Sequence, residues 1–256
     1  IAVLVLSLAS YIVTQFGTFS RTLNEKMERK EISEFNNIIV KNNTSKIVVL
    51  NEKVDNKLTF GLGNDLADLP INQSLKVDIG SKVNKEIEID FNFDKNNSVL
   101  TENIEITVSK DSKATVIIKY KSDEENEYFH NGIIKIKLAE NANLNIIIVN
   151  LINTKSNNFL SIENICEENS IAKYNMIEFG GKNNIVNYYS NLIGNYSESL
   201  INGIYLGKEN QLIDLNYIAE LRGEKTNVNI EVQGALKDEA VKHFKGTIDF
   251  KKGCKK

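Results

Sequence analysis

The chain has 256 residues, of which 41% are hydrophobic and 25% are charged, with 31 Lys and Arg against 34 Asp and Glu. This composition is typical of a folded globular protein and excludes a disordered chain. A net charge of −3 provides no basic surface for nucleic acid or for an anionic membrane, so we expect neither partner. The length allows one large domain or two ordinary ones.

The first 36 residues differ from the rest of the chain. They begin with the apolar run IAVLVLSLASYIVTQF and continue with RTLNEKMERKEISEF, which is charged and carries apolar residues at loose helical intervals. The apolar run is shorter than the roughly 20 residues that span a bilayer. We therefore predict a helical segment over residues 1–36, and a buried apolar helix is favoured over a membrane anchor.

After Asn37 the hydrophobic period changes to two, which indicates strands. The runs are rich in β-branched and aromatic residues and are bounded by Asn, Asp, Gly, Ser and Lys. We predict strands at 46–50, 75–79, 86–93, 103–108, 114–120, 132–138, 143–149, 172–179, 200–206, 211–217, 227–233 and 246–250. Residues 37–256 thus form an all-β core domain.

Polar turns recur ahead of these strands. Asp111, Asn141, Asn169 and Asn210 each occupy such a turn, and Asn183 lies about half a step after Asn169. Steps of about 28 residues favour a solenoid whose turns each hold two strands. A β-sandwich remains the alternative, because it also produces short strands at regular spacing. For the solenoid we predict a core of stacked residues: Ile136, Ile146, Ile148, Ile177, Ile204, Leu212, Ile230 and Ile248.

Motifs for catalysis are scarce. The sequence lacks a P-loop, GxGxxG, HExxH and GxSxG, so we expect no enzyme. His130, near Glu127, and His243 are isolated in sequence, and the acidic run SDEENE at 122–127 is typical of a solvated loop. Four strand carboxylates would suit a polysaccharide-active site only if the fold gathered them: Glu178, Asp214, Glu231 and Asp249.

Cys166 and Cys254 are the only cysteines. Their isolation excludes a zinc ribbon and favours a reduced, cytoplasmic chain. Cys254 is the one candidate metal ligand, because its neighbours Lys251, Lys252, Lys255 and Lys256 favour a thiolate. A single thiol without partners nevertheless favours an inert residue in a turn.

The segment from about residue 198 onward resembles the core of the SufB/SufD family of iron–sulfur cluster assembly proteins. The resemblance rests on GIYLGKENQLIDLN, EKTNVNIEVQGALKDEA and FKGTIDFKKG in this order, and it extends more loosely upstream to about residue 100. It implies a right-handed parallel β-helix that acts as a scaffold. It also implies two partners, a SufC-like ATPase and a SufB/SufD paralogue or second copy.

The resemblance implies that the family's cluster ligands and its C-terminal helical region, which binds SufC, lie beyond the strand at 246–250. We therefore expect an iron–sulfur cluster in the parent complex and none in this chain alone. Cys254 matches no ligand motif of the family. The competing interpretation, which the apolar start suits, is a secreted β-solenoid that binds or cleaves polysaccharide.

Overall fold

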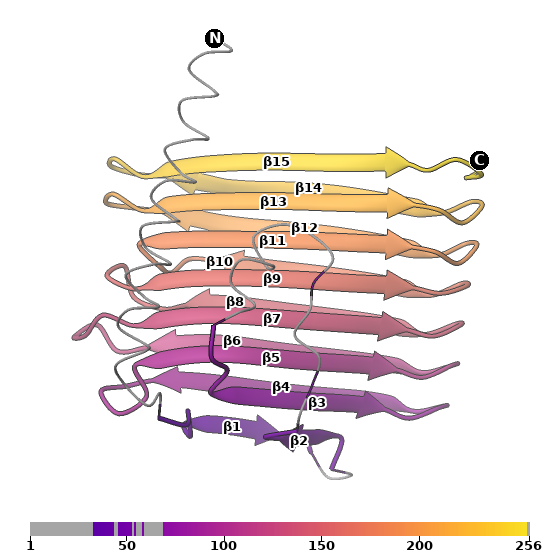
Figure 1. Cartoon of the computed structure of the whole chain (residues 1–256). Coiled ribbons are helices and arrows are strands. Elements are labelled where there is room, and N and C mark those ends of the chain that lie inside the picture. Colours follow the sequence, from indigo (N-terminus) through magenta and orange to yellow (C-terminus); the bar gives the residue numbers. More distant parts are fainter. Residues whose placement is uncertain (1–32, 44–45, 53, 55–57, 59–68, 255–256) are drawn as a thin grey trace.

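A computed structural model describes residues 33–43, 46–52, 54, 58 and 69–254. Within these ranges every regular element is a strand, and from β3 onward the strands alternate between two sheets along the chain. In Figure 1 they stack as two parallel layers from β1 and β2 at one end to β15 at the other. The all-β prediction is confirmed, and the architecture is the predicted parallel β-helix.

The two sheets are named A and B. Sheet A contains β1 (Ile38–Lys41), β4 (Asn84–Phe93), β6 (Lys113–Ser122), β8 (Asn143–Leu151), β10 (Ile171–Glu178), β12 (Glu198–Gly207) and β14 (Asn227–Leu236). Sheet B contains β2 (Val48–Leu50), β3 (Gln73–Ile79), β5 (Val99–Val108), β7 (Phe129–Leu138), β9 (Asn157–Cys166), β11 (Asn183–Leu192), β13 (Leu212–Leu221) and β15 (Val241–Phe250).

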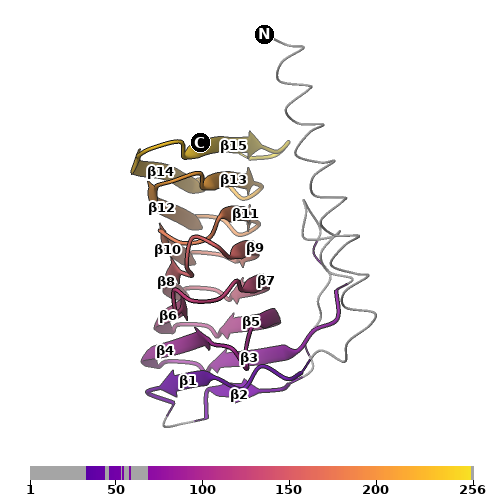
Figure 2. The same cartoon turned by 90° about the vertical axis from the view of Figure 1, so that its left-hand side faces the viewer.

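All neighbours from β3 to β15 pair in parallel and in register, whereas β1 and β2 pair antiparallel at the N-terminal end. Figure 2 shows sheets A and B facing each other across the solenoid. Alternate residues of each strand point into the space between them, so buried and half-buried residues alternate along β8 and β13. Each turn therefore buries its apolar face on the turns above and below.

The predicted core is correct in part. Ile136, Ile146 and Ile148 are fully buried. Ile230 and Ile248 also point inward, since they align with the buried Ile201 and Ala219, but they belong to the last turn and stay partly exposed.

Three predicted core residues are wrong by one position. Ile177, Ile204 and Leu212 point outward, and their neighbours Met176, Gly203 and Ile213 take the inward places. Both faces of these strands carry apolar residues, so hydrophobicity alone does not fix the register.

The corners that lead from sheet B to sheet A repeat one backbone conformation. Each contains a residue with φ between 54° and 104°, and these residues are Lys82, Asp111, Asn141, Asn169, Tyr196, Lys225 and Gly253. The amide of one such residue donates to the next corner, as from Asn141 N to Glu168 O at 2.9 Å. The predicted turn residues Asp111, Asn141 and Asn169 belong to this column.

Two of the predicted turn residues lie elsewhere. Asn210 is in the opposite corner, between β12 and β13, and Asn183 is the first residue of β11. Tyr196 and Lys225 continue the column instead.

The predicted N-terminal helix over residues 1–36 falls almost entirely outside the described residues. Residues 33–37, which are described, have no helical structure, and Phe35 is buried against Phe91 and Phe93. No helix in the described part of the chain is long and apolar enough to cross a bilayer. The domain division at residue 36 stays a prediction.

Candidate functional site

Cys254 lies in the corner that follows β15. It comes directly after Gly253, whose φ is 104°, and its amide donates to Lys251 O at 3.1 Å. The equivalent positions of earlier corners hold Val83 and the smaller residues Ser112, Ala142, Ser170, Ser197 and Thr226. The Thr226 hydroxyl is 3.8 Å from the Cys254 Sγ. The geometry therefore gives Cys254 the place of a small corner residue.

The surroundings of Cys254 offer few further metal ligands. Lys251, three residues before Cys254, bonds to Asp249 at 2.6 Å and to Glu220 at 3.0 Å, so both of these carboxylates already have a partner. Among the described residues no group of three or more His, Cys, Asp or Glu side chains converges on a point.

Cys166 is inside the solenoid. It is fully buried near the end of β9, and Asn164 Nδ2 donates to its Sγ at 3.2 Å. Burial raises the pKa of the Cys166 thiol to about 11, so the thiol stays protonated at neutral pH.

His130 belongs to a buried polar network between the two sheets. The sequence suggested Glu127 as its neighbour, but Glu127 is exposed in a loop, whereas His130 points inward from β7. Its Nε2 is 3.3 Å from Glu102 Oε1, and its Nδ1 is 2.5 Å from Asn158 Oδ1. The Tyr120 hydroxyl also donates to Glu102 Oε1. Burial, together with Glu102, raises the pKa of Tyr120.

The network continues to a second buried carboxyl group. Asn158 Nδ2 donates to Asn184 Oδ1 at 2.7 Å, and Asn184 Nδ2 donates to Glu178 Oε2 at 2.8 Å. Asn150 adds a donor to the same oxygen at 3.2 Å. Burial raises the pKa of Glu178 despite these donors, because the charged form loses its solvation.

We define the interior network as Glu102, Tyr120, His130, Asn150, Asn158, Glu178 and Asn184. Each member is at most 1% exposed, so none of them can meet a substrate from solvent. Glu102 Oε2 and Glu178 Oε1 have no hydrogen-bond partner within the described part of the chain.

The four candidate carboxylates do not form one site. Glu178 is inside the solenoid, Glu231 is on the outer face of sheet A, and Asp214 and Asp249 are on the outer face of sheet B. Asp214 aligns with His243, whose Nδ1 is 3.9 Å from its Oδ2. Burial raises the pKa of Asp214, and His243 opposes the shift. An acid–base pair of the glycosidase type is therefore not assembled from these residues.

The acidic run at 122–127 forms an exposed turn. Asp123 Oδ1 accepts from Glu125 N at 3.0 Å, and Lys155 Nζ donates to Glu124 O at 2.6 Å. Its carboxylates are dispersed rather than convergent, as expected for a solvated loop.

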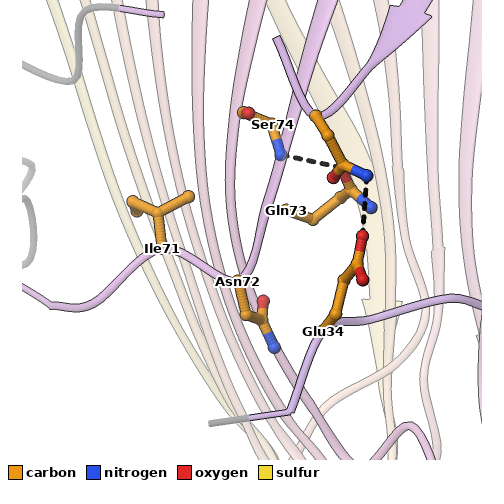
Figure 3. A pocket seen from close by; sticks show the side chains of 6 residues that line it. Glu34, Ile71, Asn72, Gln73 and Ser74 are labelled. Carbon is orange, nitrogen blue, oxygen red and sulfur yellow. Dashed lines mark hydrogen bonds between the residues drawn. The ribbon is translucent and has the colours of Figure 1, made fainter. Parts of the chain in front are cut away.

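A polar pocket lies at the N-terminal end, where β3 begins (Figure 3). It encloses about 330 Å³ and is lined by Glu34, Asn51, Ile71, Asn72, Gln73 and Ser74. Asn51 Nδ2 donates to Glu34 Oε1 at 2.6 Å, and Ser74 N donates to Gln73 Oε1 at 2.9 Å. Glu34 is the one charged group of this lining, so the pocket lacks paired acid–base groups.

The other end of the solenoid presents an apolar surface. We define the end surface as the exposed inward-pointing residues of the last turn: Leu236, Phe244, Ile248 and Phe250. They align with Gly207, Leu215, Ala219 and Leu221 of the turn below, and their exposure ranges from 41% to 63%. The outer edges of β14 and β15 pair with no further strand among the described residues (Figure 1).

These features define a class, a parallel β-helix with an apolar core that contains a buried polar network, and with one open apolar end. A family model described as "SUF system FeS cluster assembly, SufBD core domain" matches residues 91–256. The chain therefore belongs to the SufBD family and has a role in SUF iron–sulfur cluster assembly. A comparison with curated proteins returned no match.

Proposed function

We propose that this chain is a scaffold or accessory subunit of an iron–sulfur cluster assembly complex and not itself an enzyme. The family match over residues 91–256 carries the proposal. A rigid stack of strands suits a subunit that positions other proteins, since each turn is held by its two neighbours. The separation of the candidate carboxylates gives no support to the polysaccharide alternative.

The proposed partners are a SufC-like ATPase and a SufB/SufD paralogue or second copy of this chain. The end surface supports contact with the paralogue or second copy, because unpaired strand edges and exposed apolar side chains favour association. The cluster is cargo of the whole complex. Cys254 is an unsuitable sole ligand, since protein-bound clusters use several thiolates or substitutes.

We also propose a cytoplasmic location. Cys166 and Cys254 are both free thiols, and free thiols persist in reducing compartments.

Co-expression with the ABC-type ATPase and the SufB/SufD paralogue of the same genome tests the proposal. We expect all three to co-purify through a tag on the full-length form of this chain. Phe244→Lys with Phe250→Lys should weaken capture of the paralogue, whereas Glu231→Gln on the outer face of sheet A should not. Purification of the tagged chain without either partner would contradict the proposed complex.

A further inference from the structure

The outer face of sheet B lies on the right-hand side of Figure 2 and is buried. Its strands point alternate residues inward, such as Ile134, Ile162 and Tyr188, and the residues between them face outward. We define the sheet-B face as the outward apolar residues of β7, β9 and β11. Each of these residues is at most 9% exposed: Phe129, Ile133, Phe159, Ile185 and Tyr189.

The sheet-B face is covered by something other than the described strands. Sheet A faces the inner side of sheet B, and the described residues form no third sheet. On the outer face of sheet A, by contrast, Leu151, Ile204 and Leu206 are 44% to 49% exposed. The polar Asn131 and Asn187, which lie between the apolar residues of the sheet-B face, are only 1% and 5% exposed. The single chain buries this face without a partner, which points to a segment of the same chain outside the two sheets.

The covered area has limits along the solenoid. It includes Asn103 on β5, which is 3% exposed. Beyond β11 the cover is incomplete, because Ile218 on β13 is only partly buried, although it aligns with the buried Tyr189. The covered strands are therefore β5, β7, β9 and β11. Their axes span three spacings of about 4.8 Å, or roughly 14 Å.

The longest stretch outside the described residues, 1–32, ends beside this face. Asn72 Nδ2 donates to Ser33 O at 3.2 Å, and Asn72 directly precedes β3 of sheet B. The distance from β3 to β11 is four strand spacings, or about 19 Å. A helix rises 1.5 Å per residue and covers this distance with about 13 residues. A helix leading back from Ser33 therefore reaches β11 near residue 20.

The sequence of this stretch suits the sheet-B face. In the helix predicted over residues 1–36, Phe16, Phe19, Leu23 and Met27 have the spacing i, i+3, i+7 and i+11, which places them on one side. We propose that residues 16–32 dock on the sheet-B face as an amphipathic helix and close this face to other proteins. A tethered segment binds intramolecularly, so it needs less contact area than a separate partner. The inference does not depend on the proposed assembly function.

Residues 59–68 are the alternative occupant. This segment, TFGLGNDLAD, is ten residues long and contains two glycines, which disfavour a helix. It returns to the described chain beside β5, where the Thr101 hydroxyl donates to Pro70 O at 2.5 Å. A loop that starts and ends near β5 must travel to β11 and back, whereas residues 16–32 need to cross the face only once.

Photo-cross-linking of the purified 256-residue chain tests this docking. p-Benzoylphenylalanine replaces Tyr189 on the sheet-B face, and the cross-linked peptides are sequenced by mass spectrometry. The matched control carries the same group at Ile204, which is 49% exposed on the outer face of sheet A. We expect position 189 to capture a residue between 16 and 32, and position 204 to capture none of them. A mixture of chains with and without heavy nitrogen distinguishes cross-links within one chain from those between copies.

Leu23→Asp with Met27→Asp should reduce this cross-link roughly tenfold, the scale of losing central apolar contacts. Thr18→Asp with Thr22→Asp adds the same two charges at the same spacing on the opposite side of the predicted helix, so it should leave the cross-link unchanged. Capture of residues 59–68 in place of 16–32, capture of a second copy, or no cross-link at position 189 would overturn the proposal. Equal cross-linking in the two charge variants would do the same.

Discussion

The polar residues inside this solenoid are spaced by one turn of the fold. Glu102, His130 and Asn158 are successively 28 residues apart, so they lie in adjacent strands and bond to one another. A buried polar group is costly unless a neighbour satisfies it, and here each neighbour comes from the next turn. The network therefore favours one alignment of the stacked strands. The same spacing was present in the sequence, but each residue alone looks like an ordinary turn or strand residue.

Glu178→Gln tests the energetic cost of the buried carboxyl group. The folded-state pKa of Glu178 is raised above its ordinary value of 4.5. Protonated Glu178 therefore makes its full contribution to the free energy of unfolding at pH values below the unfolded-state pKa. This contribution is lost as the pH rises from there through the folded-state pKa. The glutamine side chain keeps an oxygen that accepts from Asn150 and Asn184, but it carries no charge. We expect the variant to lose less stability than the parent between pH 5 and 8, measured by urea unfolding.

Glu231→Gln is the control for this comparison, since Glu231 is exposed on the outer face of sheet A. Its pH profile should follow the parent's. Identical pH profiles for Glu178→Gln and the parent would show that Glu178 does not titrate across this range.

Anaerobic reconstitution with iron and sulfide tests the cysteines of the isolated chain. Cys166 is buried inside and Cys254 is in a corner, so we expect no stoichiometric cluster in the visible absorption spectrum. Cys254→Ser supplies the control, because serine fills the equivalent place in other corners. It should change the unfolding free energy by less than about 0.5 kcal/mol. A cluster that forms in the parent and disappears in Cys254→Ser would contradict this expectation.

At the scale of elements, the alternation of apolar and polar residues in the sequence predicts most of the strands but not all of them. Three strands were missed. β1 is a strand of only four residues. The strands β9 and β11 both start with paired asparagines, which are typical of turns: Asn157 and Asn158, and Asn183 and Asn184. Their burial patterns show little alternation, since residues on both faces are buried. Period-two patterns are lost when both faces of a strand are covered. Asn158 and Asn184 belong to the interior network. Their hydrogen bonds in the folded protein outweigh the low propensity of asparagine for strands.

Two of the corners between the sheets require glycine. A Cβ on Gly223 would lie 2.3 Å from Gly194 O, and one on Gly194 would lie 2.0 Å from Glu168 N. These contacts are with backbone atoms of the neighbouring turn, so they cannot be relieved by a side-chain rotation. Close stacking of successive corners therefore requires glycine at both positions.

Gly223→Ala should destabilise the fold by about 2 kcal/mol or more, because the corner must separate from the one below. Gly80→Ala is the matched control, since a Cβ at Gly80 meets nothing within 4 Å. Both changes stiffen the unfolded chain equally, so only the folded-state clash distinguishes them. Thermal unfolding followed by circular dichroism measures the difference. Equal melting temperatures for the two variants would refute the stacking explanation.

At the scale of the whole molecule the two ends of the solenoid differ. At the N-terminal end β1 and β2 reverse direction and pair antiparallel with β4 and β3, which interrupts the parallel stack. At the other end β14 and β15 keep the parallel direction. A terminal turn with free strand edges is a template for pairing with another chain.

We expect this 256-residue chain to self-associate through its end surface. Phe250 is 63% exposed, and it extends an inward column that continues through Leu221 in the turn below. Phe244→Lys with Phe250→Lys should abolish association, because charge on the open end opposes stacking with a second copy. Light scattering across a concentration series measures the mass. Ile39→Lys, which places the same charge on the exposed face of β1, should still associate as the parent does. If the parent is monomeric throughout, the strand edges at this end are already protected and the end surface does not drive assembly.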